Sequence, residues 1–206
     1  MTNIFPTKID VDTIASLPLG QFGGEIILID TITSLHGALK KLEKVTILGF
    51  DTETKPTFKK GRTHSVAMLQ LSTFDTSYIF RLNKIGLSDE LVQLLSNSSI
   101  TKVGLSLKDD FRELLKMRTF RPSGFIDLQS YVEKFGIQDK SLKKLTALIM
   151  GMRISKSQQT SNWEAEKLSD SQLVYAATDA WVCLEIYKKL YELETNFQAV
   201  IKSQLK

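Results

Sequence analysis

The chain has 206 residues, of which 42% are hydrophobic and 24% charged, a composition typical of a globular protein with one core. Its apolar runs are too short to cross a bilayer, its first ten residues lack a secretory pattern, and the single Cys183 excludes an internal disulfide. We therefore expect a cytoplasmic protein without a membrane partner, and we assume a monomer. The net charge of +4 suits a polyanion such as nucleic acid without identifying one.

The first part of the chain predicts strands around one helix, after a lead-in segment at residues 1–24 that contains several prolines and glycines. The strands are expected at 25–30, 45–51, 65–72 and 76–80, and a helix capped by Thr33 at 33–43. Only a few residues separate the last two strands, which favours an antiparallel hairpin. We therefore expect the sheet to open as a meander of neighbouring strands.

Helices and strands alternate from residue 88 onward. The expected helices lie at 88–96, 106–117, 127–135, 141–149 and 169–193, with strands near 100–105 and 124–127. This order predicts an α/β fold in which helices flank a mixed sheet. We expect one domain at 25–193, between the lead-in segment at 1–24 and a C-terminal helical tail at 194–206.

The stretch ILGFDTET, at residues 47–54, carries two carboxylates where a strand usually carries apolar side chains. Because strand side chains alternate between faces, Gly49, Asp51 and Glu53 share one face. The two acids then lie roughly 7 Å apart and repel each other unless a cation lies between them. The alternative is that the strand ends here and its last residues meet water.

Two helices also place acids at mostly apolar positions. Asp110 falls inside the apolar stripe of the helix at 106–117, whereas Asp109 points about 100° away, toward the solvated side. Asp179 shares a row with Val182 and Ile186 in the helix from residue 169, and Tyr175 lies one turn before it. A Tyr–Asp pair at this spacing is commonly structural, but a buried carboxylate without a partner is costly.

The four acids are expected to form one cluster, since their stripes contain no basic partner. Carboxylate oxygens suit Mg²⁺ or Mn²⁺, and the absence of paired Cys or His argues against zinc. Two such ions about 3.5–4 Å apart favour in-line displacement at phosphorus. The cluster therefore indicates phosphodiester hydrolysis.

Three segments resemble the motifs of the DEDD 3′–5′ exonucleases of the tyrosine subclass, and within it the Werner-type exonuclease domain and ribonuclease D. They are GFDTE at 49–53, KVGLSLKDDFREL at 102–114 and LSDSQLVYAATDAW at 168–181. The connecting segments SLKKLTALIMG and SNWEAEKLS are also similar, and the resemblance covers about residues 22–192. The histidine subclass has a His where this chain has Val174.

The resemblance implies a ribonuclease H-like fold, two bound Mg²⁺ or Mn²⁺ ions, and release of nucleoside 5′-monophosphates from a free 3′ end of DNA or RNA. By position, Asp51 would bridge both ions, and Glu53 and Asp179 would hold the water-activating ion. Asp110 would hold the second ion through water, and Tyr175 would orient the attacking water. Because Asp109 and Asp110 are adjacent, the alignment with the second motif can shift by one position. Asp109 is therefore the alternative to Asp110.

Basic residues flank the predicted cluster. Those expected to bind nucleic acid after the metal strand are Lys55, Lys59, Lys60 and Arg62. A second group before the third motif contains Lys140, Lys143, Lys144, Arg153 and Lys156. These side chains suit phosphates without reading sequence, although a solvated surface is an equal alternative for each. Trp163 is a candidate for stacking on a base, while a Trp just before a helix more often anchors packing.

Two functions are compatible with these patterns. The leading one is a metal-dependent 3′–5′ exonuclease, and the alternative is a catalytically silent nucleic-acid-binding module of the same fold. The presence of all four acids and of Tyr175 favours the enzyme.

Overall fold

The computed structural model describes residues 4–57 and 64–204. Within these residues, one mixed sheet has the strand order β1-β4-β3-β2-β5-β6. The strands are β1 (Glu25–Ile29), β2 (Ile47–Thr54), β3 (Val66–Ser72), β4 (Thr76–Phe80), β5 (Thr101–Gly104) and β6 (Phe125–Asp127). The helices are α1 (Val11–Ser16), α2 (Ile32–Leu42), α3 (Leu82–Ile85), α4 (Asp89–Ser96), α5 (Leu107–Met117), α6 (Leu128–Tyr131), the 3₁₀ helix η1 (Val132–Phe135), α7 (Leu142–Met150) and α8 (Asp170–Gln204).

Strand β3 is antiparallel to both of its neighbours, β2 and β4, so the predicted hairpin at 65–80 is confirmed. The remaining pairs, β1–β4, β2–β5 and β5–β6, are parallel. The meander is therefore confirmed for β2, β3 and β4 but wrong for β1, which lies at the sheet edge beside β4. Helix α2 connects β1 to β2 and lets the chain skip two positions, which places β2 in the middle of the sheet.

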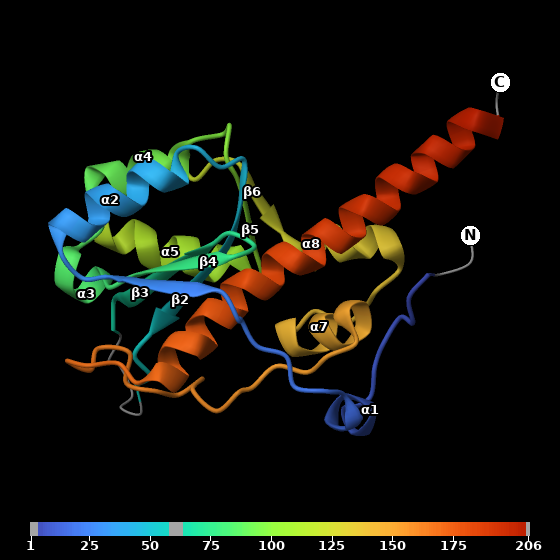
Figure 1. The fold of residues 1–206 in the computed structure, drawn as a ribbon, viewed down its shortest axis with the longest axis horizontal. Coiled ribbons are helices and arrows are strands. Elements are labelled where there is room, and N and C mark those ends of the chain that lie inside the picture. The colour runs from blue at the N-terminus through green and yellow to red at the C-terminus, as the bar shows by residue number, and fades with distance from the viewer. Residues whose placement is uncertain (1–3, 58–63, 205–206) are drawn as a thin grey trace.

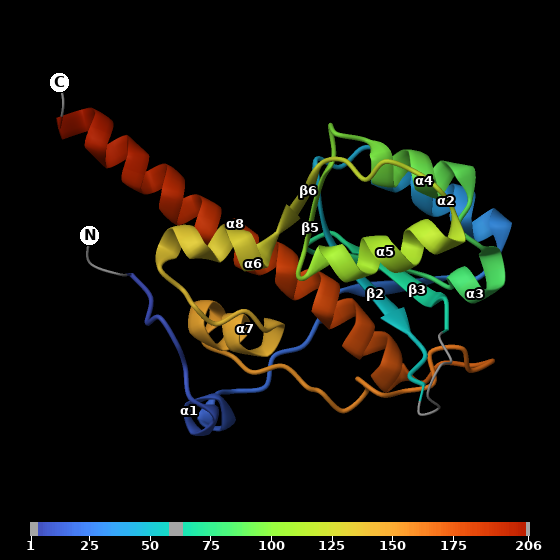
Figure 2. The same cartoon turned by 180° about the vertical axis from the view of Figure 1, so that it is seen from behind.

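Helices cover both faces of the sheet (Figures 1 and 2). On one face, α2, α4 and α5 bury a core that includes Phe50, Leu69 and Leu71 of the sheet. On the other face, α8 packs across the central strands. A Cβ atom at Gly49 would lie 1.9 Å from the carbonyl oxygen of Ala180, so a residue without a side chain is needed where α8 crosses β2.

Helix α8 has 35 residues and runs from the sheet to the C-terminal end of the described chain. The C-terminal part of this helix projects from the body of the molecule (Figure 1). The helix expected at 169–193 and the start of the expected tail are thus one element. Among the described helices, none combines the length and hydrophobicity that a membrane-spanning segment needs.

Candidate active site

Three of the predicted acids meet at the end of β2. Asp51 and Glu53 follow Gly49 on the face that α8 covers, and Asp179 comes from α8 itself. Each offers one carboxylate oxygen, and these oxygens all lie within 4.8 Å of one another. All three side chains are largely shielded from solvent, so their mutual repulsion is weakly screened. We refer to Asp51, Glu53 and Asp179 as the acid cluster.

Asp110 lies beside the acid cluster rather than inside it. The hydroxyl of Thr52, the residue between Asp51 and Glu53, donates a hydrogen bond to the Asp110 carboxylate. The charge of Asp110 also contributes to the raised pKa values of Asp51 and Glu53, after burial and the charges of their nearer neighbours. The structure thus brings all four predicted acids to one end of the sheet.

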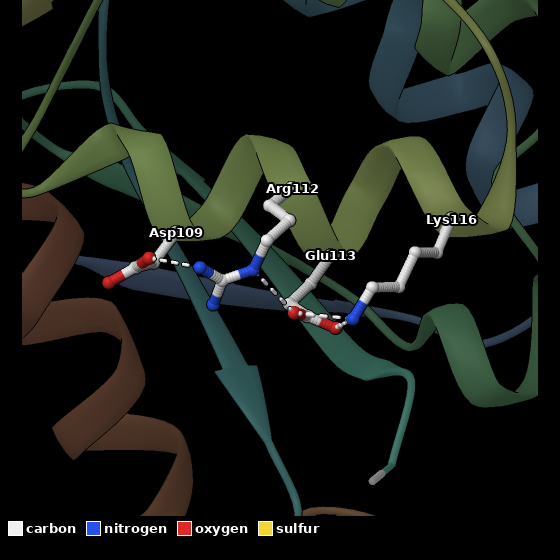
Figure 3. Close-up of polar contacts among 4 residues, drawn as sticks. All are labelled: Asp109, Arg112, Glu113 and Lys116. Carbon is white, nitrogen blue, oxygen red and sulfur yellow. Dashed lines mark hydrogen bonds and ion pairs between the residues drawn. The ribbon is translucent and has the colours of Figure 1, made fainter.

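Asp109 belongs to a different environment, on the outer side of α5 (Figure 3). Its side chain is 67% exposed, and its Oδ1 lies 2.8 Å from Nη1 of Arg112. Arg112 also contacts Glu113, which pairs with Lys116 at 2.7 Å. Asp109 therefore has a basic partner and faces solvent, whereas Asp110 accepts a hydrogen bond from Thr52 beside the acid cluster.

Burial dominates the electrostatics of the acid cluster. Burial, with the charges of Asp179 and Asp110, raises the pKa of Glu53 to about 9. Burial also raises the pKa of Asp179 to about 7 and that of Asp110 to about 6, and it raises the pKa of Asp51 well above its usual range. Without a cation the cluster holds protons near neutral pH. A divalent cation with a preference for oxygen ligands fits this set of donors.

Tyr175 lies one helical turn before Asp179, and the hydrogen bond between the two side chains lowers the Asp179 pKa against the effect of burial. Burial and the nearby carboxylates raise the pKa of Tyr175 well above its usual value. The phenol therefore stays protonated at physiological pH and can act as a hydrogen-bond donor beside the acids.

A cavity of about 570 Å³ opens over the acid cluster. The acid cluster and Tyr175 line it together with Lys140, Lys143 and Lys156, of which Lys140 pairs with Glu133 at 2.7 Å. The positive charge of Lys156 also lowers the pKa of Asp179, but this effect is smaller than the rise caused by burial. The cavity is therefore lined both by carboxylates and by cationic groups that suit a phosphodiester backbone.

The other predicted basic residues have different surroundings. Lys55 Nζ lies 3.1 Å from Glu164 Oε2, and Lys144 Nζ lies 2.6 Å from Asp139 Oδ1. Arg153 donates through Nε to the backbone oxygen of Leu17 at 3.1 Å. These contacts occupy the three side chains within the protein. Three further candidates, Lys59, Lys60 and Arg62, lie outside the described residues.

The expectation that Trp163 stacks on a base is wrong for this structure, because its side chain is 0% exposed. Its ring centroid lies 5.8 Å from that of Tyr175, so it packs behind the tyrosine instead. Arg81, itself buried, holds this segment by donating to the backbone oxygen of Glu166 at 2.8 Å. The packing alternative for Trp163 fits these contacts.

Sequence reasoning missed Thr52, whose hydroxyl connects the strand acids to Asp110. The alternation of strand side chains places Thr52 on the opposite face from Asp51 and Glu53. Alternation therefore does not predict Thr52 as a site residue. Its position within the DTE triplet was the available signal. Gln159 and Ser155, which line the cavity, lie in a polar loop without any distinguishing pattern.

Comparisons with known proteins agree with this geometry. A family model described as 3′–5′ exonuclease matches residues 26–193. The mouse (Mus musculus) bifunctional 3′–5′ exonuclease/ATP-dependent helicase WRN is 31% identical over 193 residues, covering 89% of this chain and 14% of that protein. The chain thus spans a small part of this longer relative.

Two solved structures show the same fold. The Nibbler exonuclease domain from Aedes aegypti has a TM-score of 0.75 and 26% identity, covering 88% of this chain and 96% of that one. Ribonuclease D from Trypanosoma brucei, in complex with RNA U12, has a TM-score of 0.73 and 19% identity, covering 82% and 63%. The ribonuclease H-like fold is confirmed. The chain belongs to the 3′–5′ exonuclease family, among the Werner-type and ribonuclease D-like exonucleases.

Proposed function

We propose that this chain is a metal-dependent 3′–5′ exonuclease, which hydrolyses DNA or RNA from a free 3′ end and releases nucleoside 5′-monophosphates. The observation that carries this proposal is the acid cluster, with three carboxylate oxygens within 4.8 Å of one another under a cavity that lysines also line. Membership of the 3′–5′ exonuclease family supports it.

Asp51, Glu53 and Asp179, together with Asp110 beside them, would hold two Mg²⁺ or Mn²⁺ ions. Such ions, when bound, lower the pKa of a water molecule and offset charge on the leaving oxygen. Hydrolysis forms a bond between the water oxygen and phosphorus and breaks the bond between phosphorus and the 3′ oxygen of the preceding nucleotide, which takes up a proton from water and leaves as a hydroxyl. The fit of the site to the ions rests on its oxygen donors and on the raised pKa values of those donors.

Tyr175 would orient the attacking water. Its hydroxyl lies beside Asp179 and remains protonated, so it donates to an oxygen rather than removing a proton. Trp163 packs against the tyrosine ring and limits its movement. The role of Tyr175 is therefore to position the nucleophile. Loss of its hydroxyl would lower the catalytic rate but leave substrate binding largely unchanged.

The lysines of the cavity would bind the phosphates that precede the 3′ end. Such contacts neutralise charge and do not read bases, which predicts activity on many sequences. The RNA in the ribonuclease D structure is consistent with a nucleic acid as ligand for this fold. We propose that residues 25–193 carry the activity, with the chain acting as a monomer.

The test uses single-stranded DNA and RNA labelled at the 5′ end, incubated with the protein and Mg²⁺, Mn²⁺ or EDTA. We expect a ladder that shortens from the 3′ end with either metal and no cleavage in EDTA. Asp109→Asn serves as the matched control for Asp110→Asn, because the two residues are adjacent and only one faces the site. Binding without a ladder from the wild-type protein would instead support the catalytically silent module.

A further inference from the structure

Gln70 in β3 is a buried amide without a partner. Its side chain is 0% exposed, and within the described parts of the chain neither Nε2 nor Oε1 has a hydrogen-bond partner. Buried polar groups in native proteins almost always have a partner. An amide with both polar atoms unpaired in the middle of a sheet therefore requires a ligand, a water molecule or a partner that moves into place.

The register of the sheet places Gln70 next to the acid cluster. In the antiparallel pair β2–β3, Gln70 is the direct partner of Asp51. Direct partners in antiparallel strands point to the same face, with Cβ atoms about 4.5–5.5 Å apart. The next pair on the same face of β2 and β3 is Glu53 with Met68, and Met68 packs against α8. Gln70 and Asp51 thus lie side by side beneath α8.

Helix α8 covers the Gln70 side of this pair, and Gln70 is fully buried, whereas Asp51 also lines the cavity. Its residues over the central strands, Ala176, Ala177 and Ala180, are small and fully buried. A glutamine is long enough to reach a carboxylate on the adjacent strand, whereas an alanine or a serine is not.

A neighbouring buried polar residue on this face, Ser72, has a hydrogen-bond partner. Ser72, two residues after Gln70, is also 0% exposed, and its hydroxyl lies 2.7 Å from that of Ser77. Ser72 is the direct partner of Gly49, which has no polar side chain. Of these two buried polar residues of β3, Gln70 opposite Asp51 is therefore the one without a hydrogen-bond partner.

We propose that Gln70 is a positioning residue for Asp51, whose carboxylate accepts a hydrogen bond from Gln70 Nε2 when the cation is bound. The inference rests on the proposed metal site. Carboxylates that hold a metal are themselves hydrogen-bonded, and these outer contacts fix the orientation of the ligand. Asp51 would be one of the residues that hold the cation, and Gln70 would fix the orientation of its carboxylate.

The test measures Mn²⁺ affinity by electron paramagnetic resonance and thermal unfolding without metal, for the wild-type protein, Gln70→Met and Gln70→Leu. Both substitutions place an apolar side chain of similar size beneath α8 and remove the amide. We expect both variants to stay folded, with an unchanged or higher melting temperature without metal, and with a Mn²⁺ Kd raised roughly 10-fold or more. Ser72→Ala, on the same face but away from Asp51, should leave the Kd unchanged.

The outcomes separate the two levels of the proposal. If wild-type protein binds no Mn²⁺, the proposed metal site fails. If wild-type protein binds Mn²⁺ and a folded Gln70→Met or Gln70→Leu variant binds it equally well, the role of Gln70 is overturned.

Discussion

Two groups of acids in this molecule have the same chemistry and opposite surroundings. Along the outer side of α5, Asp109 and Glu113 each contact a basic side chain, and hydrogen bonds from Lys116 and Arg112 hold the pKa of Glu113 below its usual value (Figure 3). In the acid cluster, burial and neighbouring carboxylates raise the pKa of Glu53 to about 9. The difference shows that the partner, not the residue type, distinguishes a surface acid from a site for a cation.

The largest expected effect comes from removing the ligand at the centre of the cluster. We expect Asp51→Ala to reduce the exonuclease rate by more than about 100-fold, because losing even an outer contact of a metal site has effects of that order. The metal-free melting temperature should stay the same or rise, since the substitution removes repulsion. Gel assays and circular dichroism measure the two quantities. A variant that keeps its rate would remove Asp51 from the mechanism.

The pH dependence of stability is the next test, because it reports the raised pKa values directly. The folded protein binds protons at Glu53 and Asp179 with pKa values of about 9 and about 7, above their ordinary values of 4.5 and 3.8. At pH values between the ordinary and the raised pKa values, the folded state holds more protons than the unfolded state. The free energy of unfolding therefore falls as pH rises. We expect the metal-free melting temperature to decrease from pH 5 to pH 9.

Saturating Mg²⁺ should cancel this trend, because the cation replaces the protons. The stabilisation by Mg²⁺ should therefore be larger at pH 8.5 than at pH 5.5, measured by thermal unfolding at constant ionic strength. In Asp51→Ala the metal-free slope should be shallower. A melting temperature that rises with pH in the metal-free protein would contradict the assignment of these acids as a repelling cluster.

Tyr175→Phe removes only a hydroxyl beside Asp179. We expect kcat to fall by roughly 100-fold with little change in KM, because the ring still packs against Trp163 while the water-orienting donor is lost. Single-turnover kinetics with a labelled strand separates these quantities. Equal rates for the variant and the wild-type protein would leave Tyr175 with a structural role alone.

A smaller effect is expected from Lys143→Gln, on the cationic part of the cavity. Losing one phosphate contact should weaken binding of DNA strands of unrelated sequence to a similar extent and reduce the salt dependence by about one unit of slope. Lys144→Gln is the matched control, since Lys144 pairs with Asp139. Identical salt slopes for wild type and Lys143→Gln would place the strand elsewhere.

The smallest effect is expected at the surface acids. Asp109→Ala should leave the exonuclease rate unchanged and shift the melting temperature by less than about 2 °C, because exposed ion pairs contribute little. Loss of activity in this variant would reverse the choice between Asp109 and Asp110.

Local patterns in the sequence were sufficient to predict most of the fold and the positions of the acids. Alternation along β2 and the apolar stripes of α5 and α8 depend on residues a few positions apart, and the faces they predict for Asp51, Asp110 and Asp179 agree with the structure. The mixed sheet and the hairpin followed from the same short-range patterns.

Features set by contacts between distant segments could not be predicted. The position of β1 beside β4 depends on a crossover that carries no local signal. Trp163 is buried because Met68 and Tyr175 pack with it from other parts of the chain. The start of α2 was also misplaced, because Thr31 rather than Thr33 caps it through a reciprocal hydrogen bond with Ser34.

The central claim is that a bound cation makes the gathering of these buried acids favourable. A titration of the protein with Mn²⁺, followed by electron paramagnetic resonance, tests it most directly. We expect saturable binding to the wild-type protein, at up to two ions per chain, that Asp51→Ala abolishes and Asp109→Ala leaves intact. Absence of Mn²⁺ binding to the folded wild-type protein, or equal binding to Asp51→Ala, would contradict it.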